Sequence, residues 1–145
     1  MKSITALAPW LNRVVLAFAT VLFTIIALRY ISDPVHAAAA TGAALSSAFA
    51  ATTARIGFGA FPLSLALFSF GCLLSPRRLV AGVSLVATVA LTVMAVRLFS
   101  MMADGPVAES TRLFLPEAIL LLLAISGLVL EARARSIRGK QNGIF

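Results

Sequence analysis

Four charged residues, Arg55, Arg97, Asp104 and Glu117, stand out because each lies beside or within a long apolar run. Arginine and carboxylate groups at membrane depth pair through charge-assisted hydrogen bonds, and two arginines together can hold an anionic ligand. Arg55 precedes one uncharged run, Arg97 follows the next, and Glu117 lies near the start of the last. Antiparallel helices would bring these residues to one depth, so we predict an intramembrane polar cluster made of all four.

Glu117 also has a simpler explanation. The pair Pro116-Glu117 is typical of a helix start, where proline occupies the first turn and a carboxylate lies near the positive end of the helix dipole. Both roles stay open for Glu117 at this point, a specific partner and a helix-start carboxylate. Arg29 and Arg112 are instead expected to extend their side chains to the membrane interface.

The sequence lacks catalytic and metal-binding motifs. It has one histidine and one cysteine, His36 and Cys72, and therefore no histidine pair, no cysteine cluster and no intrachain disulfide. Gly57 and Gly59 form an isolated GxG pattern, which is too short to indicate nucleotide binding. We therefore predict that the protein is not an enzyme and has no cofactor, no catalytic residue and no metal site.

The composition indicates an integral membrane protein. Of the 145 residues, 61% are hydrophobic and 12% are charged, and the mean hydropathy is +1.03. Soluble domains have about 45–50% apolar and about 25% charged residues. The formal net charge is +7. Because the basic residues flank apolar runs and form no continuous basic face, we predict no nucleic-acid partner.

Four apolar runs are long enough to cross a bilayer as helices, because about 20 such residues span the hydrocarbon core. The predicted fold is an all-α integral membrane bundle of four transmembrane helices, forming one domain over residues 1–145. The spans are expected at about 14–31, 56–74, 79–96 and 113–130. Short linkers predict that neighbouring helices are antiparallel.

Residues 34–54 form a further run that we do not expect to cross the membrane. From Ala37 onward the run is mostly alanine with serine, threonine and glycine, and its large apolar residues are Leu45 and Phe49. Its transfer free energy should therefore lie near zero. Asp33 and Pro34 are typical of a helix N-cap and first turn. We predict an outer surface helix or a helical entry into the second span.

The first span has an alternative interpretation as a cleaved signal peptide, with a small-residue site at Val35-His36-Ala37. Its apolar core is long for a signal peptide, and Arg29 and Asp33 lie between the core and that site. A retained first span is therefore the preferred interpretation.

The distribution of basic residues predicts that both termini are cytoplasmic. With the N-terminus inside, the cytoplasmic segments, including the basic tail 131–145, carry Lys2, Arg13, Arg77, Arg78, Arg133, Arg135, Arg138 and Lys140. The opposite side carries Arg29, Arg55, Arg97 and Arg112. We expect a multi-pass protein of the cytoplasmic (inner) membrane.

One face of the second span carries mainly small residues at helical spacing, namely Gly59, Pro62, Ala66 and Ser69. Helices in lipid associate through close backbone approach, which small residues permit. We predict that these four residues form a helix-packing surface. Pro62 could also mark a kink.

The stretch Arg55-Ile56-Gly57-Phe58-Gly59-Ala60, Arg97 ahead of the Asp104-Gly105 turn, and Glu117 resemble the small bacterial four-helix membrane family catalogued as domain-of-unknown-function 4345. The resemblance covers most of the chain, up to about Leu130. Phe58 stands where the family often has tyrosine, and Ala60 replaces a glycine. The resemblance implies a bacterial membrane bundle and no assigned activity. A looser likeness to the eukaryotic ergosterol-biosynthesis scaffold family, through Ala54-Arg55-Ile56-Gly57, is analogy only.

Two functions follow from these observations. The first is a non-enzymatic structural or accessory component of the membrane, whose partners are the lipid bilayer and a membrane protein or a second copy of the chain. The alternative is a small transporter or a binder of a lipophilic or anionic ligand, which would use an outer-side pocket formed by Arg55, Arg97 and Glu117.

Overall fold

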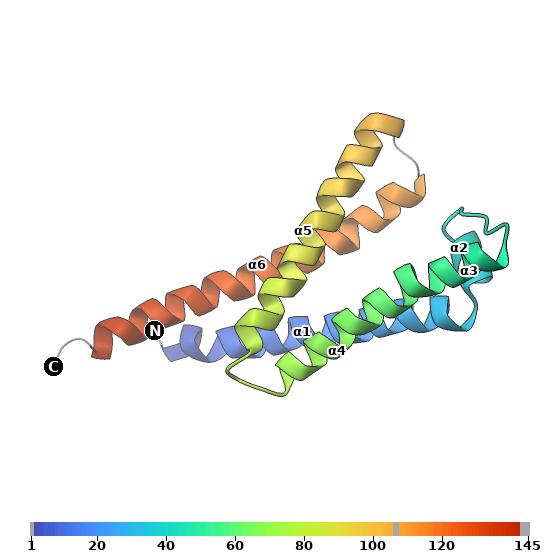
Figure 1. Cartoon of the computed structure of the whole chain (residues 1–145). Helices are drawn as coiled ribbons and strands as arrows, with labels where there is room; N and C mark the ends of the chain where they lie inside the picture. The colour runs from blue at the N-terminus through green and yellow to red at the C-terminus, as the bar shows by residue number, and fades with distance from the viewer. Residues whose placement is uncertain (1, 106–107, 143–145) are drawn as a thin grey trace. The chain divides into compact units, whose positions relative to one another are not determined.

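The computed structural model describes residues 2–105 and 108–142, and at 2–6, 104, 108–113 and 138–142 it describes the backbone alone. Each element in this part of the chain is a helix (Figure 1). The elements are α1 (Lys2–Ser32), α2 (Pro34–Ala39), α3 (Ala48–Ala54), the π-helical turn η1 (Arg55–Ala60), α4 (Phe61–Leu73), α5 (Leu79–Asp104) and α6 (Ala108–Asn142). The all-α prediction is confirmed.

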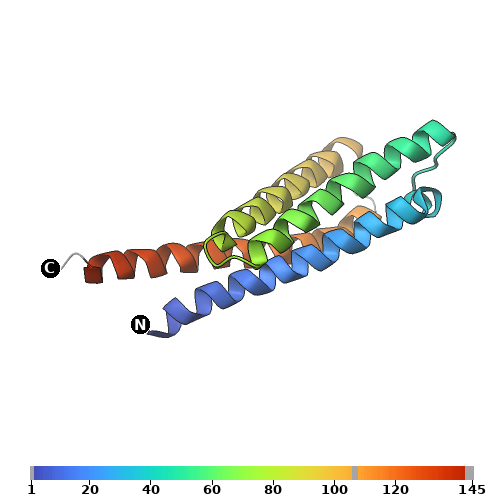
Figure 2. The same ribbon diagram turned by 60° about the horizontal axis from the view of Figure 1, so that its bottom comes forward.

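Four helical segments are long and apolar enough to cross a membrane, as predicted: Leu7–Ser32, Ala48–Leu73, Leu79–Ala103 and Phe114–Ile137. The second segment joins α3, η1 and α4 into one uninterrupted helical run (Figure 2). The helices extend beyond the apolar runs, because α1 begins at Lys2 and α6 continues to Asn142. Hydropathy identifies the residues that suit hydrocarbon, whereas a helix continues through polar residues until a turn residue ends it.

The segment 34–54 contains both a separate helix and a helical entry. Asp33 caps α2, since its Oδ1 atom accepts a hydrogen bond of 3.0 Å from the backbone N–H of His36. The predicted N-cap is therefore confirmed. Ser47 caps α3 in the same way, through a bond of 3.1 Å from the N–H of Ala50. The second helical run thus begins at Ala48, well before the predicted Ile56, and it ends at Leu73 because Leu74 lies in a turn.

The chain divides into two compact units. One unit comprises Met1–Leu16 and Cys72–Phe145, and within it α5 packs against α6. The other unit is Ala17–Gly71, which holds the second half of α1 with α2, α3, η1 and nearly all of α4. The helix α1 contributes residues to both units.

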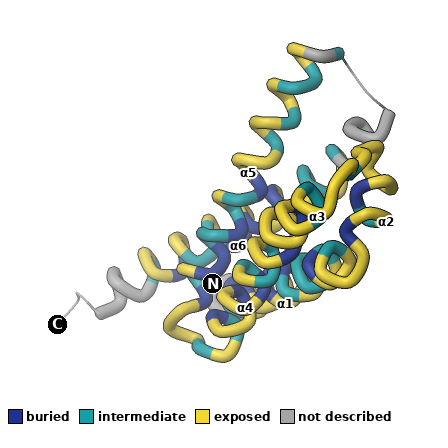
Figure 3. The backbone as a smooth tube through the Cα atoms, turned by 45° about the vertical axis from the view of Figure 1, so that its right-hand side comes forward, coloured by how far each residue is buried: buried dark blue, intermediate teal, exposed yellow. Residues whose placement is uncertain are grey.

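Much of each long helix is exposed. Buried residues (dark blue) alternate with exposed ones (yellow) along the helices in Figure 3. In an 18-residue apolar stretch of each candidate span, between 17% and 28% of the residues are buried. The exposed faces carry large apolar residues, including Phe18, Leu67, Leu91, Phe99 and Leu122. Lipid tails are as apolar as leucine, so such faces suit a bilayer.

Candidate functional site

Among the described residues, a bidentate ion pair joins Arg97 of α5 to Glu117 of α6. Arg97 Nε donates to Glu117 Oε2 at 2.7 Å, and Arg97 Nη2 donates to Glu117 Oε1 at 2.5 Å. The side chains are 18% and 23% exposed. Two parallel hydrogen bonds between a guanidinium and a carboxylate form a bidentate pair, which is both strong and geometrically specific. The pair therefore ties α5 to α6 and neutralises both charges.

Glu117 lies inside α6 and not at its start. Pro116 lies inside α6, which begins at Ala108, so the prediction that Pro116-Glu117 opens a helix is wrong. The attraction of a carboxylate to the helix dipole falls off within the first turn, which Glu117 has passed. The helix continues through Pro116 because backbone groups in lipid must bond within their own segment, although proline removes one such bond. The pairing with Arg97 therefore accounts for Glu117.

The other two residues of the predicted cluster have different surroundings. Arg55 is exposed in the unit Ala17–Gly71, and its Nε donates to the backbone carbonyl of Ile31 at 3.3 Å. That carbonyl lies in the last turn of α1, where carbonyl oxygens lack helical partners. Asp104 ends α5, and its side chain lies outside the described residues. The structure thus brings together Arg97 and Glu117, and it gives Arg55 a backbone partner.

The predicted packing stripe lies partly against α1. Gly59 is buried, and a Cβ atom added there would lie 2.8 Å from Ile31 Cγ1. Nearby, the rings of Tyr30 and Phe58 lie 5.2 Å apart between centroids. Ala66 and Ser69 are also buried, and Pro62 is half-buried. The close approach at Gly59, the ring contact and the Arg55 hydrogen bond hold the end of α1 to η1.

The turn η1 was not foreseen from the sequence. The N–H of Phe61 donates to the carbonyl of Ile56, five residues earlier, so this turn contains one residue more than an α-helical turn. Pro62 follows directly and has no N–H to donate. The sequence signal for this turn is therefore the combination of Gly57, Gly59 and Pro62. From the sequence, the two glycines together were considered only as an isolated GxG pattern, and Pro62 only as a packing residue or a kink.

Asn12 of α1 was also missed. It is 1% exposed, and neither its Nδ2 nor its Oδ1 atom has a hydrogen-bond partner among the described residues. The amide lies against Gly127 of α6, where an added Cβ would collide with Oδ1. The only sequence signal is an amide beside Arg13 at the polar end of the first apolar run. Burial of an unpaired amide is costly, so this position calls for a physical explanation.

The residues with metal-binding side chains do not gather. Among the residues whose side chains the structure describes, no group of three or more His, Cys, Asp and Glu could hold a metal ion. His36 is exposed on α2, and Cys72 is buried.

Comparison with known proteins yields no relative. No family model, curated protein or solved structure matches this chain. The chemistry of the Arg97–Glu117 pair therefore has to be argued from its own geometry.

Proposed function

We propose that this protein is a non-enzymatic, multi-pass component of the cytoplasmic membrane with a structural or accessory role. The observation that carries the proposal is the bidentate Arg97–Glu117 pair, which commits the paired charges to helix–helix contact. An arginine and a glutamate that neutralise each other have little remaining capacity to bind or transform a substrate. The resemblance to a four-helix family without assigned activity is compatible with this role.

The exposed apolar faces support an accessory role as well. The long helices leave residues such as Leu91 and Phe99 of α5 uncovered. In the proposed setting, lipid covers part of this surface, and a membrane-protein partner or a second copy of the chain covers the rest.

The alternative function, a transporter or binder with an outer-side arginine and glutamate pocket, receives less support. It requires Arg97 to turn toward an anionic ligand, which would leave Glu117 as an unpaired charge among apolar residues. Breaking a fully buried pair in this way costs about 3–5 kcal/mol, and breaking this partly exposed pair in a membrane should cost about 2–3 kcal/mol. A ligand would have to recover that free energy before it gained any affinity.

Affinity purification tests the proposed role. The tagged full-length chain is extracted in mild detergent and, separately, in lipid nanodiscs, beside an unrelated four-helix membrane protein as control. We expect a defined membrane-protein partner or a homo-oligomer that the control does not retain. A lone monomer in every extraction would contradict the accessory role.

We further propose that both termini are cytoplasmic and that neighbouring spans are antiparallel. The basic residues at both ends and in the turn that contains Arg77 and Arg78 support this orientation. In a Cys72→Ser background, Arg77→Cys should resist a membrane-impermeant thiol reagent in intact cells, whereas Thr41→Cys should react. Labelling of Arg77→Cys instead of Thr41→Cys would reverse the orientation.

A further inference from the structure

A small cavity with polar and apolar walls lies within the unit formed by Met1–Leu16 and Cys72–Phe145. Its volume is about 180 Å³, and its lining comes from α1, α5, α6 and the turn before α5: Pro9, Asn12, Arg13, Pro76, Leu79, Val80 and Glu131. Taking about 30 Å³ for each water molecule, the cavity has room for roughly six. That space suits a small polar group, since pockets for drug-sized ligands measure about 300–1,000 Å³.

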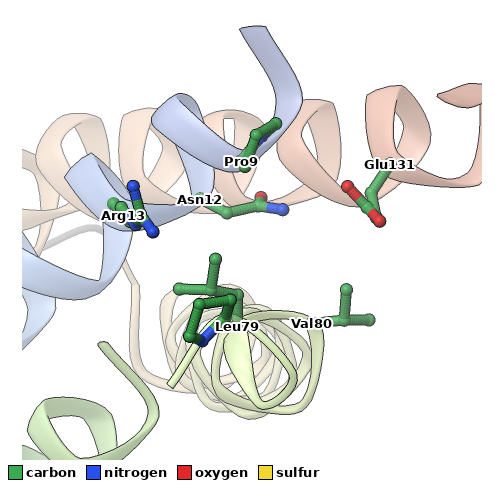
Figure 4. Close-up of a pocket in the computed structure, with 7 residues that line it drawn as sticks. Pro9, Asn12, Arg13, Leu79, Val80 and Glu131 are labelled. Atoms are coloured by element: carbon green, nitrogen blue, oxygen red, sulfur yellow. The ribbon is translucent and has the colours of Figure 1, made fainter. Parts of the chain in front are cut away.

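Two polar side chains face this cavity. Figure 4 shows the amide of Asn12 and the carboxylate of Glu131 extending toward the same space, beside Leu79 and Val80. In this figure the Asn12 nitrogen points toward that space, and the buried amide has no hydrogen-bond partner among the described residues. The cavity therefore presents an amide that can donate hydrogen bonds opposite a carboxylate that accepts them.

The lining of the cavity includes one basic and one acidic residue, Arg13 and Glu131. Arg13, which is exposed, lies in the lining next to Asn12. Glu131 is 14% exposed and accepts a bond of 3.1 Å from Arg135 Nε. A carboxylate has about four acceptor positions, so a donor in the cavity can share Glu131 with the partners that it already has. A group that carries an anion and a hydrogen-bonding cation would match Arg13 and Asn12 on one side and Glu131 on the other.

The cavity lies where the apolar runs end. Asn12 and Arg13 directly precede the run that starts at Val14, Leu79 and Val80 begin α5, and Glu131 follows the run that ends at Leu130. Trp10, one turn from Arg13, is exposed, as expected for tryptophan at a membrane interface. In a bilayer that covers the uncharged runs, this position would lie at the depth of the lipid head groups.

We propose that this cavity binds a zwitterionic phosphate–ammonium group, of the kind carried by an aminophospholipid head group or by the corresponding free phosphodiester. The phosphate accepts hydrogen bonds from Asn12 Nδ2 and from Arg13, and the primary ammonium donates to Glu131. Occupation of the cavity gives the buried Asn12 amide the partner that it lacks among the described residues. The site is separate from the Arg97–Glu117 pair and does not depend on the proposed accessory function.

Native mass spectrometry of the delipidated full-length chain tests the site with three probes. They are phosphatidylethanolamine, phosphatidylcholine with the same acyl chains, and glycerophosphoethanolamine. Phosphatidylcholine keeps the phosphate but has no ammonium N–H. The ammonium of phosphatidylethanolamine can donate a charged hydrogen bond to Glu131, so phosphatidylethanolamine should bind at least about tenfold more tightly than phosphatidylcholine. Equal binding of the two lipids to the unmodified chain would overturn the proposal without any variant.

Two variants test the phosphate-binding and ammonium-binding parts of the site separately. Glu131→Gln should remove the preference for phosphatidylethanolamine over phosphatidylcholine, whereas Asn12→Leu should weaken both lipids to a similar extent. Thr92→Val, on an exposed part of α5 outside the lining, should change neither affinity. If the preference persists in Glu131→Gln, the assignment of the ammonium to Glu131 is wrong.

The third probe distinguishes the two sources of the group. Glycerophosphoethanolamine that binds as tightly as the lipid, with the same loss in Glu131→Gln, would support the binding chemistry and identify a free phosphodiester as the ligand. Binding of the lipid alone would identify a membrane head group. A failure of all three probes to bind would overturn the site.

Discussion

Removing the charges of Arg97 and Glu117 one at a time and then together measures how strongly this pair holds α5 to α6. The variants are Arg97→Met, Glu117→Met and the double substitution. Methionine is flexible and apolar, so it fills the vacated space without introducing a new charge. Either single substitution leaves the remaining charge without its partner at membrane depth, whereas the double substitution leaves no charge.

The structure sets the size of the effect. The pair makes two hydrogen bonds, at 2.7 and 2.5 Å, between side chains that are 18% and 23% exposed. Charged hydrogen bonds contribute about 1.5–3 kcal/mol each, but an unfolded chain in a membrane finds other partners, which lowers the net value. Each single substitution should therefore lower the free energy of unfolding by about 2–3 kcal/mol. The double substitution should lower it less than Glu117→Met alone, so the coupling should exceed the loss from either single substitution and be more than about 2–3 kcal/mol.

The assay is reversible unfolding of the full-length chain in mixed micelles, followed by circular dichroism. Glu131 and Arg135 supply the internal control, because they form a pair within one helix in which Arg135 is 61% exposed. The same cycle on that pair should give a coupling of about 0.3–0.5 kcal/mol. Additive losses at Arg97 and Glu117, within about 0.5 kcal/mol, would refute the argument that each charge depends on the other.

Three further predictions concern local features. Gly59→Ala should lower the free energy of unfolding by about 1–3 kcal/mol, because the added Cβ would meet Ile31. Gly57 has open space around it, so Gly57→Ala should leave the free energy of unfolding unchanged or raise it by up to about 1 kcal/mol in the same assay. Equal losses in the two variants would contradict the close approach at Gly59. Buried Cys72 should react with a maleimide only after unfolding, and rapid labelling of the folded chain would show that the cysteine is accessible. Asp33→Ala should remove the cap of α2, which contributes about 1 kcal/mol, and should speed amide exchange at His36, and an unchanged rate would exclude that bond.

The sequence was sufficient for the fold class and for the approximate centres of the spans, because both depend on the lengths of apolar runs. It did not locate the helix ends. The second helical run starts at Ala48, where the local signal is Ser47, a single capping residue among many small polar ones. Pro116 misled the prediction for α6, because proline is typical of a helix start and yet is tolerated inside a membrane helix.

The same limits apply to the polar residues. Arg97 and Glu117 could be paired from the sequence because their positions along adjacent spans predict similar depths. Arg55 could not be matched with its acceptor, because that acceptor is the backbone carbonyl of Ile31, and a carbonyl is present at every residue. The π-helical turn depends on a shift of hydrogen-bond register from Ile56 to Phe61, which side-chain periodicity does not record.

The Arg97–Glu117 pair and the buried Asn12 amide differ in whether their hydrogen-bonding groups have partners. Arg97 and Glu117 are easily noticed in the sequence because they are charges beside apolar runs, and they hydrogen-bond to each other. A ligand would have to break this pair before binding to either residue. Asn12 carries no charge and was not singled out from the sequence. Its buried amide borders a cavity and has no hydrogen-bond partner in the part of the chain that the structure describes. A ligand gains hydrogen bonds at Asn12 without displacing existing ones. Substitutions at the charged pair should therefore register first in stability, and substitutions at the cavity first in binding.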